Sequence, residues 1–195
     1  MGIFSKLFNS GPDRKAWPAL ASCIAKGLED YRHIWFSQCI ETFQARATID
    51  PNIRIINTRL EGKAELAIKA YQIFWVTCFL VEHAYIPPSK DKDFADILYA
   101  QICGTQFHEC MMFFKRYYEV ENDGPQQLLR FSSDVAEHIA GTENLYDASL
   151  LVNVHFSDFV AFNHMVLAGC FGDQQTVKKV EEKLLKLYEK EVSEH

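Results

Sequence analysis

The residues whose side chains could most obviously bind a metal are His108, Glu109 and Cys110, which follow one another in an aromatic-rich segment. Their side chains are three of the commonest metal ligands in proteins. Consecutive residues of a helix are rotated by about 100° from one another, so the three cannot converge on one ion from a single helix. We therefore expect no metal here, with His108 and Glu109 in solvent and Cys110 in the core.

Other acidic residues and histidines are spaced so that a carboxylate and an imidazole share one face of a helix. Helical bundles build di-metal sites from such pairs, with Glu-x-x-His present twice and two further glutamates. That complete pattern is absent from the sequence, so we expect solvated or border positions for the first two of the three pairs. The pairs are Glu29 with His33, Asp134 with His138, and His155 with Asp158.

The third pair belongs to a segment that has no lysine or arginine, LYDASLLVNVHFSDFVAFNHMVLAGCFG. A helix that is apolar around most of its circumference is normally surrounded by others, which predicts a central helix near residues 143–171. Buried polar groups need partners, so its few polar residues are informative. They fall on two stripes, one with Tyr146, Asn153, Ser157 and His164, the other with His155 and Asp158.

Two interpretations of these stripes remain open. In the first, one stripe meets solvent through a gap and the other binds a neighbouring loop or backbone carbonyl. In the second, the stripes line a polar pocket in the bundle, with the imidazole of His155 oriented by Asp158. A histidine paired with a carboxylate can accept a proton, bind a ligand or make a structural contact.

Known catalytic signatures do not support a more specific chemistry. The sequence has no G-x-S-x-G, no H-E-x-x-H, no P-loop and no glycine-rich dinucleotide turn. We therefore assign no catalytic residue, no metal and no cofactor. Enzymatic activity stays an open question, and the missing signatures weigh against it.

The elements that position these residues are helices, because apolar residues recur at helical spacing along nearly the whole chain. The sequence predicts an all-α, single-domain bundle of about six helices over residues 13–195. A short amphipathic or disordered segment, residues 1–12, precedes it. The six helices are expected at residues 18–47, 58–85, 93–121, 125–141, 143–171 and 176–192.

Charge and hydropathy exclude several classes of function. The net charge is −6, and no lysine or arginine occurs between Arg130 and Lys178. Nucleic-acid binding needs a basic face, so we do not expect it. The most apolar stretch, AYQIFWVTCFLV, has fewer than the roughly 20 residues that cross a bilayer, which indicates a core helix and no transmembrane segment.

The six cysteines are typical of buried thiols in a reducing cytoplasm, because no C-x-x-C pair and no secretory signal is present. Cys103 and Cys110 are expected on one helix, roughly 10 Å apart along its axis, which is too far for a disulfide.

Two functions from different classes follow. The first is a non-catalytic cytoplasmic bundle that acts through protein–protein interaction or regulation, as a dimer or with another protein. The second is a bundle that binds a small-molecule ligand or a metal, as a binding protein or as an enzyme, through the polar residues of the helix at 143–171. A cavity reached by those residues favours the second, and a filled core with an exposed apolar patch favours the first.

Overall fold

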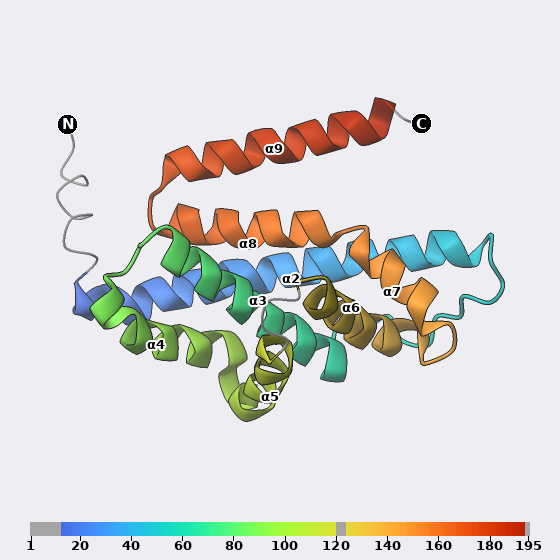
Figure 1. Ribbon diagram of the computed structural model, residues 1–195, viewed down its shortest axis with the longest axis horizontal. Coiled ribbons are helices and arrows are strands. Elements are labelled where there is room, and N and C mark those ends of the chain that lie inside the picture. The colour runs from blue at the N-terminus through green and yellow to red at the C-terminus, as the bar shows by residue number, and fades with distance from the viewer. Residues whose placement is uncertain (1–12, 120–123, 194–195) are drawn as a thin grey trace.

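The computed structural model describes residues 13–119 and 124–193, and this part of the chain is all-α, without strands (Figure 1). The predicted fold class is therefore confirmed. The predicted N-terminal segment, residues 1–12, lies outside the described residues. The elements are η1 (Arg14–Ala16), α2 (Trp17–Ala47), α3 (Gly62–Glu82), η2 (Pro88–Lys90), α4 (Asp91–Cys103), η3 (Gly104–Gln106), α5 (Phe107–Tyr118), α6 (Gly124–Ala140), α7 (Leu145–Asn153), α8 (Phe156–Cys170) and α9 (Gln174–Ser193).

The long helix α2 extends along the whole bundle, and the other helices pack around it and around α3 (Figure 1). Helix α8 lies along α2, and α9 lies on the other side of α8. Helix α4 packs on α2, α5 packs on α3, and α6 packs on both α3 and α7. Helix α8 is thus central in position, between α9 and the α2–α3 pair.

The core consists of two clusters of buried side chains at the two ends of the bundle. One cluster centres on aromatic rings, with Trp35, Tyr71, Phe131 and Phe159 in mutual contact. The other includes Trp17 and its neighbours from α2, α3, α4 and α8. This packing of large rings accounts for the high aromatic content of the sequence.

Two of the predicted helices are broken. The helix expected at 93–121 ends at Cys103, because Gly104 has φ +58°, a conformation that side chains strongly disfavour. The chain restarts as η3 and α5. The helix expected at 143–171 is α7 followed by α8, at an angle of 44°. At this break the His155 N–H bonds the Val152 carbonyl, three residues back, as in a 3₁₀ turn.

Helix α3 buries 11 of its 21 residues, a larger share than either α7 or α8 of the segment at 143–171. The absence of lysine and arginine was a poor guide to burial, because exposed apolar residues occur on α7 while α3 buries the charged Lys69. By length and composition α3 could also cross a membrane, and so could α7 and α8 taken as one bent span. More than half of the apolar window of α3 is buried among the other helices, as in a core helix of a soluble protein.

Candidate functional site

The break between α7 and α8 separates the polar residues that the sequence placed on two continuous stripes. Asn153, at the end of α7, accepts a hydrogen bond from Ser132 of α6. The imidazole Nε2 of His155 lies 2.7 Å from the hydroxyl of Thr42 on α2, and its carbonyl accepts a bond from the Trp35 indole. Asp158 is half-buried in the first turn of α8. These contacts join α6, α7 and α8 to their neighbours.

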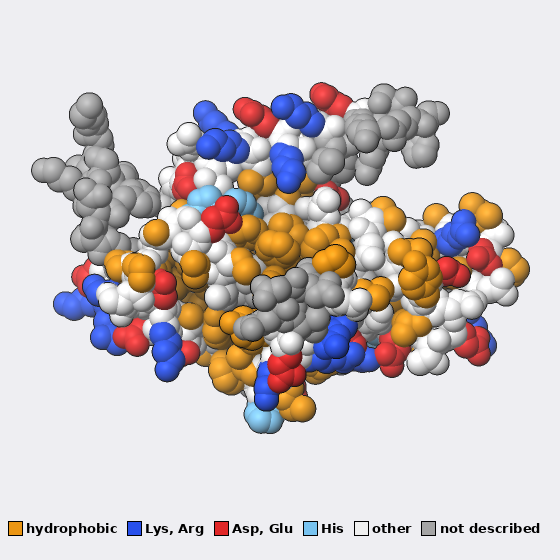
Figure 2. Space-filling view, viewed as in Figure 1, with side chains coloured by type: hydrophobic (Ala, Val, Ile, Leu, Met, Phe, Trp, Pro, Cys, Tyr) orange, Lys and Arg blue, Asp and Glu red, His pale blue; other side chains and the backbone are white. Residues whose placement is uncertain are grey.

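Ser157 and His164 do line a groove, of about 500 Å³, between α3, α8 and the start of α9. In Figure 2 an apolar area lies beneath α9, with histidine side chains at its edge. The groove lining does not include Asn153, His155 or Asp158, so the predicted residues do not form one site. The other lining residues are Trp75, Glu82, His83, Phe156, Val160, Ala161, Thr176, Lys179, Val180 and Lys183.

The two histidines of this groove face each other. His83 Nε2 and His164 Nε2 are 2.9 Å apart, so one nitrogen must carry the proton and the other must accept it. The His164 ring also stacks on Phe79 at 4.1 Å. Burial, and next the charge of His83, lower the pKa of His164 below its ordinary value. Nearby Glu82 and Asp173 act in the opposite direction.

This lowered pKa predicts a pH-dependent stability. The unfolded chain takes up the His164 proton at a higher pH than the folded chain, so the histidine's contribution is complete above about pH 6.5 and is lost as the pH falls towards the folded pKa. We expect His164→Gln to flatten the fall in the free energy of unfolding between about pH 7.5 and 5, measured by urea titration. His33→Gln, at an exposed histidine, is the matched control. Parallel profiles of His164→Gln and wild type would contradict the assignment.

A larger cleft, of about 740 Å³, lies on another side of the bundle, where α2 and α3 meet the junction of α4 with η3. Its lining is mostly polar. Exposed charged residues of α2 form its rim, and side chains that are nearly inaccessible form its floor. The lining residues are Ser22, Ala25, Lys26, Glu29, Asp30, Arg32, Glu65, Lys69, Gln101, Ile102, Cys103, Gly104, Thr105 and Gln106.

The guanidinium of Arg32 is the most unusual group of this cleft. The residue is only 4% exposed, and its Nε donates a hydrogen bond of 3.0 Å to Gln72 Oε1. The ion pairs among the described residues do not include Arg32. Burial lowers its pKa, and Glu65 and Glu29 counteract this from a distance. Arginine keeps its charge in proteins, so the cleft has a buried cation without a contacting carboxylate in the described part of the chain.

The position of Arg32 is fixed from behind by Gln72, which is fully buried. The Gln72 amide donates to the Leu28 carbonyl at 2.9 Å and lies 3.4 Å from Asn163 Oδ1 of α8. Gln72 therefore holds Arg32 between three helices, and its own amide cannot rotate without losing both contacts. A preorganised cation of this kind is typical of a binding site.

Lys69 is the second cation at the floor, 8% exposed. Its ammonium contacts Glu65 and Gln106, each at 2.6 Å. The pair with Glu65 is electrically neutral, so the floor retains the one net positive charge of Arg32. Gln106 comes from η3, which means that the break at Gly104 completes the site.

The same break brings two thiols together beneath the cleft. Cys103 and Cys110 are both buried, and the hydrogen bond between them lowers the pKa of Cys110, with smaller contributions from Lys69 and Arg32. The pKa of Cys103 is raised, first by the same bond and then by burial. The expectation that these cysteines lie about two helical turns apart was wrong, because it assumed an unbroken helix.

The remaining candidate ligands singled out in the sequence lie mostly in solvent. His108 and Glu109 are exposed while Cys110 is buried, as predicted. Glu29 is on the cleft rim, and the neighbouring His33 is exposed. Among the described residues, no group of three or more His, Cys, Asp or Glu side chains could hold a metal ion.

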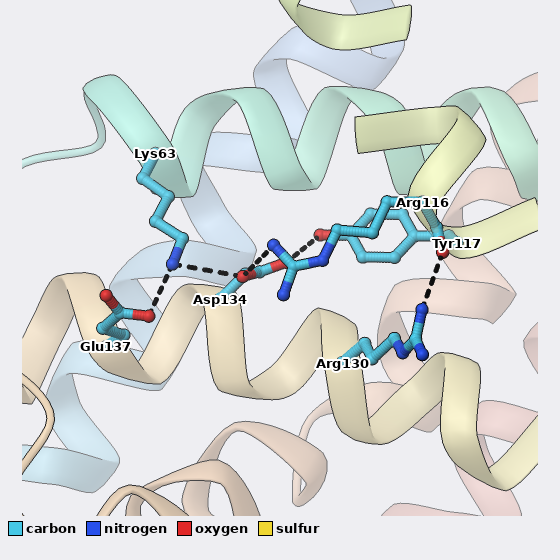
Figure 3. Close-up of polar contacts among 6 residues, drawn as sticks. All are labelled: Lys63, Arg116, Tyr117, Arg130, Asp134 and Glu137. Atoms are coloured by element: carbon cyan, nitrogen blue, oxygen red, sulfur yellow. Dashed lines mark hydrogen bonds and ion pairs between the residues drawn. The ribbon is translucent and has the colours of Figure 1, made fainter. Parts of the chain in front are cut away.

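The pair of Asp134 and His138 is split between two environments. Asp134 is buried, and its carboxylate contacts Lys63, Arg116 and the Tyr117 hydroxyl (Figure 3). His138 instead contacts the Arg59 carbonyl at 2.8 Å. The expected border position was therefore wrong for Asp134, which serves a structural network between α3, α5 and α6.

Comparison of the chain with protein-family models, curated proteins and solved structures gives no match. The site must therefore be interpreted from its own geometry. Sequence reasoning missed Arg32 and Lys69, although a signal was present. Each is a charged residue in an otherwise apolar pattern: Arg32 follows Leu28 by one turn, and Lys69 lies within the apolar run of α3.

Proposed function

We propose that the protein is a helical bundle that binds a small anionic ligand, with a carboxylate or phosphate group, in the cleft between α2, α3 and η3. The observation that supports this most directly is Arg32, a nearly inaccessible guanidinium with no ion-pair partner in the described residues. A buried charge is costly without a counter-charge, and an anionic ligand would supply one.

The chemistry of the cleft matches such a ligand. The planar guanidinium presents donors in a fork that suits carboxylate and phosphate oxygens. The volume of about 740 Å³ is in the range of small-molecule sites. Both signs of charge occur on the rim, with Lys26 beside Glu29 and Asp30. We expect the ligand to place its anionic group at Arg32 and a polar remainder at this rim.

The proposal is for binding, and it assigns no catalytic role to any residue. It retains ligand binding, the second of the two functions derived from the sequence, but moves the site from the 143–171 segment to α2 and α3. We also propose a cytoplasmic location, which is consistent with the free thiols of the six cysteines.

Anion titration tests the proposal. We expect phosphate, acetate or citrate, at ionic strength held constant with sodium chloride, to raise the melting temperature of the wild type. An anion at ten times its dissociation constant stabilises by about 1.4 kcal/mol, or roughly 3–5 °C for a chain of this size. Arg32→Lys keeps the charge but removes the fork, and we expect it to weaken binding at least about tenfold.

Arg54→Lys is the matched control, because Arg54 is exposed and outside the cleft. It should titrate like the wild type. The proposal is contradicted if none of the three anions exceeds chloride, or if Arg32→Lys responds as strongly as the wild type.

A second candidate function, association with another protein or with a second copy of this chain, is favoured by α7. Tyr146 and Leu150 of α7, and Val154 directly after it, follow at intervals of four and are all exposed, which gives a largely apolar stripe on the surface. Native mass spectrometry of the purified protein distinguishes the candidates, since it reports a bound small molecule and the oligomeric state together.

A further inference from the structure

Cys23 of α2 and Cys170 of α8 lie 147 residues apart in the sequence, yet their Sγ atoms are 3.3 Å apart. Cys23 is exposed and Cys170 is partly buried, so the pair is at the surface. We propose that Cys23 and Cys170 are a modification site for hydroperoxides, which oxidise the two thiols to a reversible intramolecular disulfide. This goes beyond ligand binding and does not depend on it.

The two helices are held close together at this point. Cys23 of α2 lies against Cys170 of α8, and Gly27, one turn later on α2, lies against Val166, one turn earlier on α8. The two helices are therefore antiparallel here. A Cβ on Gly27 would lie 2.8 Å from Val166 Cγ1, so only glycine allows this approach without a shift. A disulfide needs Cα atoms within about 7 Å of each other, and the close approach of the two helices at Gly27 and Val166 favours such a separation.

Aromatic contacts keep the same two helices in register further along. Tyr31 stacks on Phe162 with ring centroids 4.1 Å apart, and Trp35 packs edge-on against Phe159 at 4.9 Å. The Trp35 indole also donates to the His155 carbonyl at 2.8 Å. The thiols therefore meet because of a rigid interface, and not through a chance orientation of two surface side chains.

The two thiols have different roles. Cys170 Sγ donates the hydrogen bond to Cys23 Sγ, so the acceptor is the exposed sulfur of the pair. Burial, and next the bond to Cys23, raise the pKa of Cys170 to about 12, so this thiol keeps its proton. The exposed Cys23 is thus the thiol that reacts with an oxidant. Cys170 is the resolving thiol, which attacks the oxidised sulfur of Cys23.

The reaction balances in two steps. The Cys23 thiolate attacks one oxygen of hydrogen peroxide, the O–O bond breaks, and the hydroxide that leaves is protonated to water; Cys23 becomes a sulfenic acid. Cys170 sulfur then attacks the Cys23 sulfur, and the hydroxyl group leaves with the Cys170 proton as a second water. The two thiols lose two electrons in total to the peroxide, and a dithiol reductant reverses the change.

The disulfide would tie the end of α8, and so the start of α9, to the first part of α2. It closes a loop of most of the chain, and such loops lose the most conformational entropy in the unfolded state. We expect the melting temperature to rise by roughly 10 °C on oxidation and to return on reduction.

The test is treatment of the full-length protein with a small excess of hydrogen peroxide. We expect the intact mass to fall by two hydrogen atoms, the digest to contain a peptide that links Cys23 to Cys170, and the melting temperature to rise. Cys78→Ser is the matched control, because Cys78 is partly buried on α3 and outside the pair, and it should behave like the wild type.

Cys23→Ser and Cys170→Ser should each prevent both the loss of hydrogen and the thermal shift. In Cys170→Ser we expect Cys23 to gain oxygen instead, since the resolving thiol is missing. Cys23→Ala, at an exposed position, serves if the serine variant does not fold. The proposal is overturned if wild-type Cys23 gains oxygen without the linked peptide, or if the pair variants still lose two hydrogen atoms.

Discussion

Phe159→Ala is expected to lower the free energy of unfolding by about 3–5 kcal/mol, as for other fully buried aromatic residues. Phe159 is 0% exposed, and its ring lies 4.9 Å from Trp35 and 5.3 Å from Phe131 between centroids. Tyr71 is the third neighbour, at 6.0 Å. The truncation would leave a cavity among rings that cannot collapse into it, because each is held by further contacts.

Urea denaturation of both proteins measures this difference, and the melting temperature should fall by roughly 10 °C or more. Phe107→Ala is the matched control, since Phe107 begins α5 and is 41% exposed. It should cost less than about 1 kcal/mol. Equal losses in the two variants would mean that the cluster around Phe159 does not stabilise the fold.

The burial of Phe159 was predictable from the sequence, whereas the arrangement around it was not. Apolar residues recurred at helical spacing, so the fold class and most helix ends could be predicted to within about one turn. The two breaks could not be placed. Gly104 looked like one more glycine in a helical pattern, and only its positive φ shows that the chain turns there.

The same break explains why the cleft was missed. The cleft needs η3 to turn Gln106 towards Lys69 of α3, and it needs α4 to end beside α2. With a continuous helix at 93–121, Gln106 would not reach Lys69. The residues at 143–171 drew attention because they include no lysine or arginine. The informative residue was the reverse case, a charge within an apolar face. Arg32 was such a residue.

Asp134 provides the second large effect. Its carboxylate is nearly inaccessible and lies 3.2 Å from the Lys63 ammonium, 3.1 Å from the Arg116 guanidinium and 2.8 Å from the Tyr117 hydroxyl (Figure 3). Arg130 adds a bond of 3.2 Å to the Arg116 carbonyl. Asp134 is therefore the common acceptor through which α3, α5 and α6 are joined.

We expect Asp134→Ala to lower the free energy of unfolding by about 2–4 kcal/mol. The Tyr117 hydroxyl, fully buried, would lose its acceptor, and that loss alone costs about 1–3 kcal/mol. Lys63 and Arg116 are partly exposed and can turn towards water, which keeps the expected loss below that of a fully buried ion pair. Asp93→Ala is the control, because the Asp93–Arg14 pair is exposed, and it should change the free energy by less than about 0.5 kcal/mol.

A double-mutant cycle with Tyr117→Phe separates the contribution of the Asp134–Tyr117 hydrogen bond from the effect of removing side-chain volume. Tyr117→Phe removes only the hydroxyl, so in the wild-type background it deprives Asp134 of one donor. In the Asp134→Ala background the same change removes an unpaired buried hydroxyl and should cost less, or should stabilise. We expect a coupling energy above about 1 kcal/mol between the two changes. Additive effects would mean that the carboxylate and the hydroxyl contribute independently, and that the junction of α3, α5 and α6 is held by apolar packing instead.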